Sequence, residues 1–333
     1  MHARALICDA HQRFSYTDVI LPDPGSEQIL VRTRYTGVSI GTEFALIRGK
    51  LSWGPYPLCT GYQGVGLVER VGKKVNGFTA GDRVYYRDNR VIALPDGQSV
   101  SAVAGVHCSS AVIDPRTTHG LALLPDGADE EAASLYVMPA VGLNGVDMAN
   151  PRMGETVAVY GSGLIGLGVV AACSHRGCVV IAIDIDQRRL DIARTLGADY
   201  VINGSEQNVT DALKHITPEG ADVVFEATGI PACIDPAIAL CKTHGKFILQ
   251  GNYGAEPISY HFLPPHGKRL TMFYPCDDGF ASCRRAVLKN IARGVLPWHS
   301  TITHRVQAHD APALYDAINK GEADDVVGAV IRW

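Results

Sequence analysis

The sequence lacks three features that would each assign it to a class of protein. No stretch approaches the roughly 18 apolar residues needed to cross a bilayer, which argues against a membrane partner. Lys and Arg number 30 against 34 Asp and Glu, so the formal net charge of -4 gives no basic excess for nucleic acid. The first residues, "MHARALICDAHQRF", show no basic-then-apolar export signal. We therefore expect a cytoplasmic protein whose partner is a small molecule.

Paired cysteines are also missing. The nine cysteines are scattered, their number is odd and no C-x-x-C occurs. This usage is typical of reduced, mostly buried thiols in a reducing compartment, where packing is their ordinary role. With 333 residues, the chain has the length of one large domain or of two domains of ordinary size.

Short β-type runs dominate the chain up to about residue 125. Examples are "QILVRTRYTGVS", "GVGLVERVG" and "DRVYY", which are separated by the turn-forming stretches "PDPG", "NGFTAGD" and "LPDG". Strands of this length with turn residues between them predict a curled antiparallel sheet.

From about residue 130, strands and helices alternate. "DEEAASLYVMPAVGLNGVDMA" has helical spacing and an acidic start. The strand-like runs "ETVAVYG", "VVIAID", "ADVVFEATG" and "GKFILQG" follow, with helical stretches such as "IDPAIALCKTH" between them. The alternation predicts an α/β fold with a parallel, doubly wound sheet. The tail "APALYDAINKGEADDVVGAVIRW" predicts a helix and an edge-like strand that return to the first domain.

A G-x-G-x-x-G motif, formed by Gly161, Gly163 and Gly166, follows the predicted strand "TVAVY" and opens a helix. The first glycine permits a tight turn, the second lets the backbone approach a pyrophosphate, and the third lets helix and strand pack closely. Free N–H groups at the helix start favour the phosphate charge. The other residues of this predicted phosphate loop are Ser162, Leu164 and Ile165.

An acidic residue follows at the spacing of a dinucleotide site. Asp184 ends the next predicted strand, about 20 residues after Gly163. Its carboxylate can accept hydrogen bonds from both ribose hydroxyls and would repel a 2′-phosphate, so we expect NAD(H) in preference to NADP(H). Arg188 and Arg189 follow on the next helix, where either could meet a 2′-phosphate. We favour a solvated helix face for this pair and keep Arg189 as a candidate cofactor contact.

Two further strand ends belong to the predicted cofactor site, because ligands bind outside the carboxyl ends of the strands in such sheets. Thr228 and Gly229 end "FEATG" and are expected on the adenosine or ribose side. Gln250 and Gly251, in "LQGNYG", are expected at the nicotinamide carboxamide. Ordinary βα turns are the alternative for both.

Six stretches occur in a characteristic order along the chain: "GVSIGTEFALIRG", "PLCTGYQGVGLVERVG", "FTAGDRV", "GSGLIGLG", "DIARTLGADYVIN" and "FEATG". In these stretches and their order, the chain resembles the medium-chain dehydrogenase/reductase superfamily over almost its whole length. The resemblance implies a GroES-like β-rich catalytic domain, residues 1–130 and 297–333, and a Rossmann NAD(H)-binding domain, residues 131–296, with the active cleft between them. It also implies a homodimer formed through sheet edges, for which "GKRLTMFY" is a candidate strand.

The positions that hold zinc in many members of that superfamily carry other residues here. The family stretch G-[IV]-C-G-[ST]-D reads "GVSIGTE", so its cysteine falls on Ser39 or Ile40. The family's G-H-E reads "GYQ", with Tyr62 and Gln63, and Met138 stands where a glutamate often precedes a proline. Zinc is bound by Cys, His, Asp or Glu, so we expect no catalytic zinc. The cysteines of a structural zinc lobe are missing as well.

Without a metal, side chains must supply the proton chemistry that accompanies hydride transfer. A carbonyl being reduced needs a donor for its developing oxyanion, and an alcohol being oxidised needs a base. The catalytic candidates are Tyr62, Gln63, Thr42 and Ser39, which occupy the stretches that surround the metal in zinc relatives. Tyr62 is the first choice for acid–base catalysis, and packing beneath the nicotinamide is its alternative.

Two further residues near these stretches are expected to be structural. Glu43 replaces the aspartate of the family motif, and His107 lies in the apolar run "SAVAGVHCSSAVI", which favours a hydrogen-bonded core histidine. A proton relay through His107 is the alternative.

The leading hypothesis is a zinc-independent, NAD(H)-dependent oxidoreductase that interconverts a secondary alcohol and a ketone on a small, cyclic or polyhydroxylated substrate. "GVSIGTE" and "GYQ" resemble the bacteriochlorophyllide dehydrogenase branch, and the rest of the chain is similar to polyol and cyclitol dehydrogenases. The main alternative is an NAD(P)H-dependent carbon–carbon double-bond reductase of the enone or quinone type, which also lacks zinc. A third hypothesis is an NAD-binding protein without activity.

Overall fold

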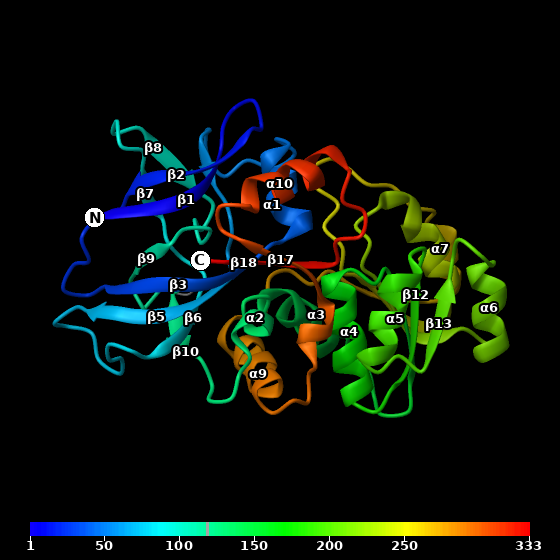
Figure 1. Ribbon diagram of the computed structural model, residues 1–333. Coiled ribbons are helices and arrows are strands. Elements are labelled where there is room, and N and C mark those ends of the chain that lie inside the picture. Colours follow the sequence, from blue (N-terminus) through cyan, green and yellow to red (C-terminus); the bar gives the residue numbers. More distant parts are fainter. Residues whose placement is uncertain (118–119) are drawn as a thin grey trace. The chain divides into compact units, whose positions relative to one another are not determined.

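The computed structural model describes residues 1–117 and 120–333, which divide into two compact units (Figure 1). The first unit contains Met1–Tyr136, Ile291–Arg293 and Ile302–Trp333, and the second contains Val137–Asn290 and Gly294–Thr301. The domain boundary predicted at residue 130 differs from this division. Ser134 and Leu135 are fully buried in the first unit, where they pack against Gly37. The predicted limit at 297 falls inside the segment Gly294–Thr301.

The first unit is built on a closed barrel and a seven-stranded sheet. The barrel order is β1-β2-β7-β8-β4, and the sheet order is β10-β6-β5-β3-β18-β17, with β9 paired to β3. The strands are β1 (His2–Cys8), β2 (Phe14–Ile20), β3 (Ile29–Gly37), β4 (Leu58–Cys59), β5 (Gly64–Val71), β6 (Arg83–Tyr86), β7 (Val91–Ala93), β8 (Ser99–Ala102), β9 (Ser110–Ile113), β10 (Leu121–Leu123), β17 (Ile302–Gln307) and β18 (Gly328–Arg332).

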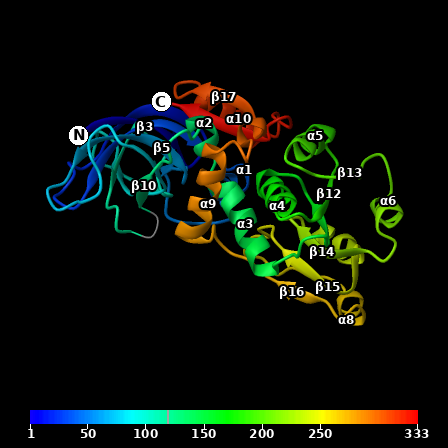
Figure 2. The ribbon, with the colours of Figure 1, turned by 90° about the horizontal axis from the view of Figure 1, so that it is seen from below.

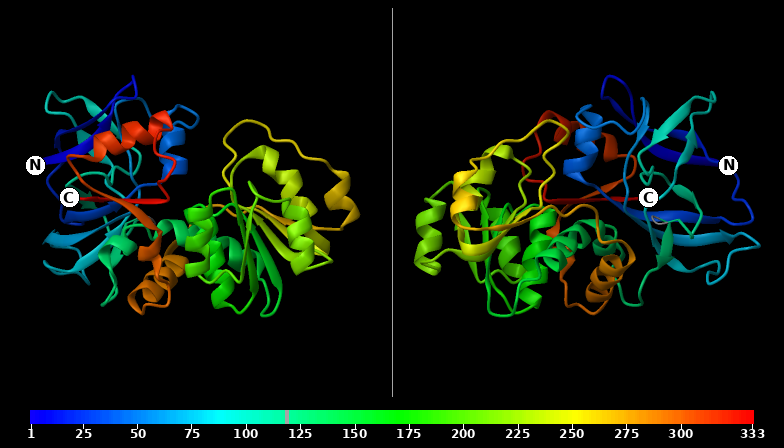
Figure 3. Two further views of the ribbon diagram at one scale, coloured as in Figure 1. Left: turned by 45° about the vertical axis from the view of Figure 1, so that its right-hand side comes forward. Right: turned by 180° about the vertical axis from the view of Figure 1, so that it is seen from behind.

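Strand β3 lies at the centre of this unit. Its inward residues Val31 and Thr33 are buried and its outward residues Arg32 and Arg34 are exposed, which is the period of two expected for a strand with one face on a core. The C-terminal strand β18 pairs antiparallel with β3, so the end of the sequence joins a sheet formed largely by strands of the N-terminal half. Figure 3 marks the two termini, which both belong to the first unit. The sequence predicts an edge-like strand at the end of the tail, but β18 is internal because β17 pairs with its other side.

Two helices of the first unit, α1 (Ile40–Ile47) and α10 (Ala311–Lys320), share a hydrophobic core. Phe44 of α1 and Tyr315 of α10 stack with their ring centroids 5.2 Å apart. Helix α10 ends at Gly321, whose positive φ of 74° gives the left-handed cap that glycine adopts without strain. The packing brings together segments from opposite ends of the chain.

The second unit contains a six-stranded parallel sheet in the order β13-β12-β11-β14-β15-β16, which confirms the predicted doubly wound fold. Figure 2 shows β14, β15 and β16 side by side. The strands are β11 (Thr156–Tyr160), β12 (Val179–Asp184), β13 (Tyr200–Asn203), β14 (Ala221–Glu226), β15 (Cys241–Leu249) and β16 (Thr271–Phe273). The helices of this unit are α3 (Val137–Ala149), α4 (Leu164–His175), α5 (Gln187–Thr195), α6 (Val209–Ile216), η1 (Pro231–Cys233), α7 (Ile234–Ala239), α8 (Leu263–Gly267), η2 (Trp298–Thr301) and most of α9 (Phe280–Ala292).

Two predicted helices differ from the structure. The stretch from residue 130 is two helices rather than one: Asp129 caps α2 (Glu130–Ala133) by accepting a hydrogen bond from the Ala132 amide, and α3 starts only at Val137. Proline is tolerated in the first turn of a helix, and Pro139 therefore fits the start of α3 and not the interior of a longer helix.

The second difference concerns "IDPAIALCKTH". Its helix α7 ends at Ala239, and Cys241 already begins β15. The Lys268 ammonium donates hydrogen bonds to the carbonyl oxygens of Ile238 and Ala239 at the end of the helix, and to that of Cys241 at the start of β15. Among residues 1–117 and 120–333, no helix is both long enough and apolar enough to span a membrane.

Candidate nucleotide and substrate sites

The glycine loop of the second unit has the close packing that its motif predicts. Gly161 has a φ of 104°, and a Cβ there would lie 2.8 Å from Thr228 Cγ2. A Cβ on Gly166 would lie 1.9 Å from the Gly161 carbonyl oxygen, so helix α4 and strand β11 could not approach as they do. A Cβ on Gly163 would meet nothing closer than 3.9 Å, where Arg189 Nη1 lies. The first and third glycines are therefore required by packing, and the second borders open space.

Ser162 provides an independent indication of a ligand at this loop. Its side chain is fully buried, and within the described part of the chain its Oγ has no hydrogen-bond partner. A buried hydroxyl without a partner is unfavourable in a native protein unless a bound group satisfies it. It lies directly before Gly163, the N-cap of α4, where backbone N–H groups and the helix dipole favour an anion. These residues fit the phosphates of a dinucleotide.

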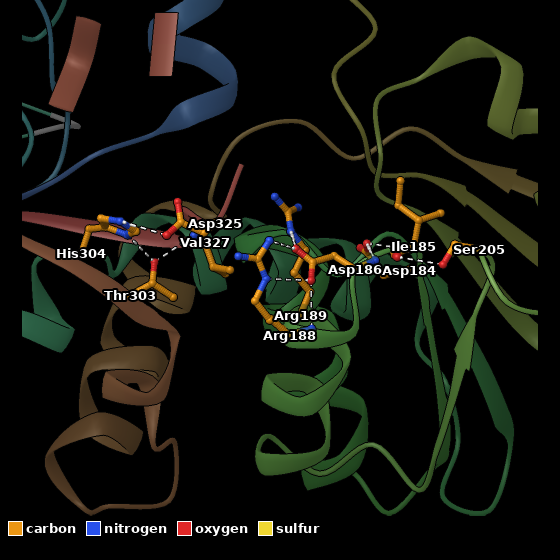
Figure 4. Close-up of polar contacts among 10 residues, drawn as sticks. All are labelled: Asp184, Ile185, Asp186, Arg188, Arg189, Ser205, Thr303, His304, Asp325 and Val327. Atoms are coloured by element: carbon orange, nitrogen blue, oxygen red, sulfur yellow. Dashed lines mark hydrogen bonds and ion pairs between the residues drawn. The ribbon is translucent and has the colours of Figure 1, made fainter. Parts of the chain in front are cut away.

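Asp184 is fixed by the backbone around it (Figure 4). Its Oδ2 accepts a hydrogen bond from the Ser162 amide at 2.7 Å, and its Oδ1 accepts from the amides of Ile185 and Asp186 at 2.8 and 3.0 Å. A carboxylate has about four acceptor positions, so three are occupied. Binding both ribose hydroxyls, as the sequence suggested, would need one of these backbone bonds to be released.

The two arginines after Asp184 have different surroundings. Arg188 is held by Asp186, with Nη2 2.8 Å from Oδ2, and its hydrogen bonds lower the pKa of the Asp186 carboxyl. Arg189 contacts Asp186 only at 3.9 Å, while its Nη1 faces the open side of Gly163. Arg189 therefore places a positive charge beside the glycine loop. Among the other residues labelled in Figure 4, Ser205 donates a hydrogen bond to the Ile185 carbonyl within the second unit, whereas Thr303, His304, Asp325 and Val327 belong to the first unit.

The ends of β14 and β15 lie against the glycine loop. Thr228 packs on Gly161, and a Cβ on Gly251 would lie 2.4 Å from the Gly229 amide nitrogen, so the two following loops approach closely. Gln250 is almost fully buried, and its Oε1 has no hydrogen-bond partner within residues 1–117 and 120–333, while its Nε2 donates to the Val141 carbonyl at 3.3 Å. A buried acceptor without a partner fits a ligand with an amide or hydroxyl donor.

The sequence reasoning missed one residue of this edge, Glu226. It is fully buried at the end of β14, where it accepts hydrogen bonds from the Thr228 amide and hydroxyl and from Tyr253 Oη. Burial, and then the hydrogen bond to Glu226, raise the pKa of Tyr253. A charged residue inside the apolar strand "ADVVFEATG" was the available signal, since a buried charge is found where partners are arranged around it.

The predicted substrate-side residues of the first unit also come together. Tyr62 is almost fully buried and its hydroxyl donates a hydrogen bond to Ser39 Oγ. Burial raises the pKa of Tyr62, and hydrogen bonds with Ser39 and Thr42 and the charge of Arg87 reduce this effect without cancelling it. The phenol is therefore held in its protonated form at neutral pH. Gln63, the next residue, is fully buried.

Behind Ser39 lies a buried polar network that the sequence did not predict as a unit. The Ser39 amide donates to Glu43 Oε1 at 2.8 Å, and Glu43 Oε2 accepts from Tyr315 Oη at 2.7 Å. His107 places Nε2 3.0 Å from Glu43 Oε2 and Nδ1 2.8 Å from Thr36 Oγ1. Burial acts to raise the pKa of Glu43, but the His107 charge and the hydrogen bonds from His107 and Ser39 outweigh it and lower the pKa. We call Thr36, Glu43, His107 and Tyr315 the buried network.

The network agrees with the structural roles expected for Glu43 and His107, because both side chains are fully enclosed and hydrogen-bonded. No signal in the sequence pointed to Tyr315, which lies 272 residues after Glu43. Within residues 1–117 and 120–333, no group of three or more His, Cys, Asp and Glu side chains is placed to hold a metal ion.

Two family models match the chain. The model described as "Alcohol dehydrogenase GroES-like domain" matches residues 25–121, and the model described as "Zinc-binding dehydrogenase" matches residues 165–291. The chain is similar to an alcohol dehydrogenase of Cupriavidus necator, with 29% identity over an alignment of 359 positions that covers 96% of each chain. It is also similar to the sorbitol dehydrogenase of Bacillus subtilis, with 28% identity over 249 positions that cover 69% of this chain and 70% of the relative.

The fold is likewise similar to a solved structure. A putative zinc-binding dehydrogenase from Sinorhizobium meliloti, bound to NADP, superposes with a TM-score of 0.86 at 20% identity, and the match covers 100% of both chains. Together with the two domain matches, the relatives show that the chain belongs to the medium-chain dehydrogenase/reductase superfamily, a group of oxidoreductases. The expected GroES-like and Rossmann folds are thereby confirmed.

Proposed function

We propose that this protein is a zinc-independent, NAD(H)-dependent oxidoreductase that interconverts a secondary alcohol and a ketone on a small cyclic or polyhydroxylated substrate. The observation that carries the proposal is the hydrogen bond of Tyr62 to Ser39 at the stretches where zinc relatives hold their metal. The alcohol dehydrogenase and sorbitol dehydrogenase relatives support the reaction class. The glycine loop and the unpartnered Ser162 support the dinucleotide.

The residues at the zinc positions do not fit a zinc ion. Ser39 or Ile40, Tyr62, Gln63 and Met138 offer no thiolate, imidazole or carboxylate, although zinc requires such donors. The proton chemistry of the proposed reaction therefore depends on side chains. Less than about 0.1 zinc per chain in the purified, active protein is the expected result of elemental analysis, whereas one zinc per chain would contradict this part of the proposal.

The protein's own residues can supply the proton chemistry. A bound nicotinamide supplies or accepts the hydride. In the reducing direction, the substrate carbonyl carbon gains that hydride and its oxygen takes the Tyr62 proton, which gives the neutral alcohol. The phenolate that remains is stabilised by the hydroxyls of Ser39 and Thr42, which can rotate to donate, and by the Arg87 charge. In the oxidising direction, the same phenolate accepts the alcohol proton.

The cofactor assignment rests on Asp184 and Arg189. The Asp184 carboxylate would repel a 2′-phosphate where it meets the ribose, which favours NAD(H) over NADP(H). Arg189 borders the open side of Gly163 and is assigned to a phosphate of the cofactor. Gln250, with Gly251 beside it, is assigned to the nicotinamide carboxamide, because its buried Oε1 can accept from the amide. Thr228 and Gly229 are assigned to the adenosine or ribose side.

A homodimer is part of the proposal. Strand β16 (Thr271–Phe273) forms one edge of the six-stranded sheet, and the neighbouring Tyr274 is exposed. An edge strand presents unpaired backbone groups that a second copy could pair with. The cytoplasmic location expected from the sequence remains a prediction.

The deciding experiment traces the hydride. The protein is incubated with 4-deuterated NADH and a panel of cyclic enones, and NMR locates the deuterium in the product. We expect deuterium on the carbonyl carbon, with the double bond intact. Deuterium on the β-carbon would identify a carbon–carbon double-bond reductase, in which Tyr62 and Ser39 stabilise an enolate. Tyr200→Phe, an exposed tyrosine of the second unit, is the matched control for Tyr62→Phe in this assay.

A further inference from the structure

A cavity of about 310 Å³ within the first unit has Tyr62 in its wall. Its lining consists of Trp53, Tyr62, Arg87, Asp88, Arg90, Ala102, Val103 and Ala104. A volume of this size is at the lower end of the range for small-molecule sites, so it suits a ring of six atoms with one or two substituents. The cavity wall contains the candidate proton donor, Tyr62, and more positively than negatively charged side chains.

The charges in the wall sum to a cationic excess, with two arginines and one aspartate. Asp88 is mostly buried, and Arg90 Nε lies 2.8 Å from its Oδ1, so the anion in the wall is already paired. The Arg90 side chain is 65% exposed, which leaves its guanidinium accessible to a ligand. A concave site with an excess of one sign attracts the opposite charge.

Arg87 links this charge to Tyr62. Its Nε donates to the Tyr62 carbonyl oxygen at 3.2 Å, and its guanidinium carbon lies 5.3 Å from the centroid of the Tyr62 ring. The arginine is therefore oriented by the backbone of the residue that carries the candidate proton. A ligand anion near Arg87 and Arg90 would be held close to the same tyrosine.

The remaining wall is apolar. Trp53 is 58% exposed on the loop between α1 and β4, and the backbone and side chains of Ala102–Ala104 form the adjoining surface. An exposed indole beside a cavity offers a flat apolar surface for a ring, whereas the arginine fork offers paired donors for an oxyanion. The indole would contact the ring of a ligand, and the arginines would bind an anionic group of the same ligand.

We infer that the substrate of this protein is an anion, a ring-bearing ketone or alcohol with a carboxylate or phosphate group that Arg90 and Arg87 bind while the ring contacts Trp53. This inference rests on the proposed function for the identity of the reacting group. It adds a substrate class to that proposal and assigns Arg90 as a residue that determines specificity.

Binding is tested first without turnover. Cyclohexanecarboxylate and cyclohexyl phosphate, which contain no ketone, are titrated into the protein while tryptophan fluorescence is recorded. We expect saturable binding of at least one of them, and the tighter of the two identifies the anionic group. Arg90→Gln should weaken that binding about tenfold or more, because a charge-assisted hydrogen bond is lost. Trp53→Phe should remove the fluorescence change, since Trp53 is the tryptophan in the wall.

Arg70→Gln is the matched control. Arg70 is also an exposed arginine of the first unit, but it lies outside the cavity wall and faces Asp23. Its replacement changes the net charge of the protein equally and should leave the dissociation constant within about twofold. Equal weakening by Arg70→Gln and Arg90→Gln, or no saturable binding of either anion, would overturn the inference. Arg90→Lys keeps the charge and is expected to recover part of the affinity.

The kinetic arm uses 4-oxocyclohexanecarboxylate and cyclohexanone as a charged and a neutral ketone. We expect kcat/KM to favour the charged ketone, and this preference to fall about tenfold in Arg90→Gln. An unchanged preference would overturn the inference even if both ketones are reduced. If neither ketone is turned over but the anions bind in an Arg90-dependent way, the proposed reaction fails and the anion site stands.

Discussion

The two units form their proposed polar sites from different groups, backbone in the second unit and side chains in the first. The proposed nucleotide site of the second unit depends on backbone: a tight turn at Gly161, helix amides after Gly163 and close loops at Gly229 and Gly251. The substrate side of the first unit depends on side chains, with Tyr62 on Ser39 and a buried network behind them. A site built from backbone groups is encoded by a short continuous motif. A site built from side chains brings together residues that are far apart in the sequence.

The largest effect, a loss of catalytic rate, should come from removing the Tyr62 hydroxyl in the first unit. Tyr62→Phe deletes the proposed proton donor and is expected to lower kcat by about 10²–10⁴-fold, the usual contribution of general acid–base catalysis. The dissociation constant for NADH, measured by fluorescence titration, should stay within about twofold, because the glycine loop is untouched. Retention of full turnover would remove Tyr62 from the mechanism.

The buried network should give the next largest effect, on stability. Glu43→Gln leaves His107 without its buried anionic partner, and breaking one side of a buried pair costs about 3–5 kcal/mol in the free energy of unfolding. Glu69→Gln, an exposed glutamate of β5, should change that free energy by less than about 1 kcal/mol. Urea unfolding of the three proteins at pH 7 checks both numbers. Similar loss in the two variants would show that the network does not stabilise the unit.

The same variants predict a pH dependence. The folded-state pKa of Glu43 lies below its ordinary value of 4.5, so its stabilising contribution is fully present above pH 4.5 and is lost as the pH falls through the folded-state pKa. The unfolding free energies of the parent and Glu43→Gln should therefore approach each other below pH 4.5. A difference that stays constant between pH 7 and pH 3.5 would contradict the lowered pKa.

The glycine loop offers a smaller and more selective test. Gly166→Ala places a Cβ 1.9 Å from the Gly161 carbonyl, so we expect a loss of about 1–3 kcal/mol in stability together with weaker NADH binding. Gly163→Ala meets no atom within 3.9 Å, so its melting temperature should hold while NADH binding weakens about tenfold through lost space for phosphate. Equal changes of melting temperature in Gly166→Ala and Gly163→Ala would contradict the conclusion that Gly166 is required for packing and Gly163 leaves space for a ligand.

The smallest effect is expected in cofactor preference. Asp184→Asn removes the charge and keeps one oxygen for the Ile185 and Asp186 amides, while an NH2 group replaces the acceptor of the Ser162 amide. The ratio of kcat/KM for NADH over NADPH should therefore fall about tenfold. Asp191→Asn, on the exposed face of α5, should leave this ratio unchanged. An identical ratio in Asp184→Asn and the parent would show that the carboxylate does not select the cofactor.

The comparison also explains what the sequence could predict. The Rossmann sheet follows from alternating apolar strands and amphipathic helices. The assignment of Thr228 and Gln250 to the cofactor site rests on the rule that ligands bind at strand ends, and it stays a prediction. The Tyr62 stretch was found by resemblance, and its contact with Ser39 depends on the packing of the segment after β4 against the start of α1. Glu226 was visible as a charge in an apolar strand, but its partner Tyr253 follows the next strand, β15.

The failures share a physical cause, since they depend on contacts between segments far apart in the chain. Helix α7 stops early because Lys268 binds its terminal carbonyls from 30 residues away. Tyr315 could not be assigned to the buried network because no motif near it in the sequence indicates a contact with Glu43 or His107. Local propensity carries no information about such partners, and tertiary contacts override it.

The pairing of β18 with β3 has a consequence for synthesis on the ribosome. Glu43 and His107 emerge early, but Tyr315 and β18 are made only after the whole second unit has been translated. The second unit is continuous over Val137–Asn290 and can fold while the first unit still lacks two strands and a helix. During that interval the nascent chain carries an incomplete β-rich unit with open strand edges, which is the stage most exposed to aggregation and to chaperone binding.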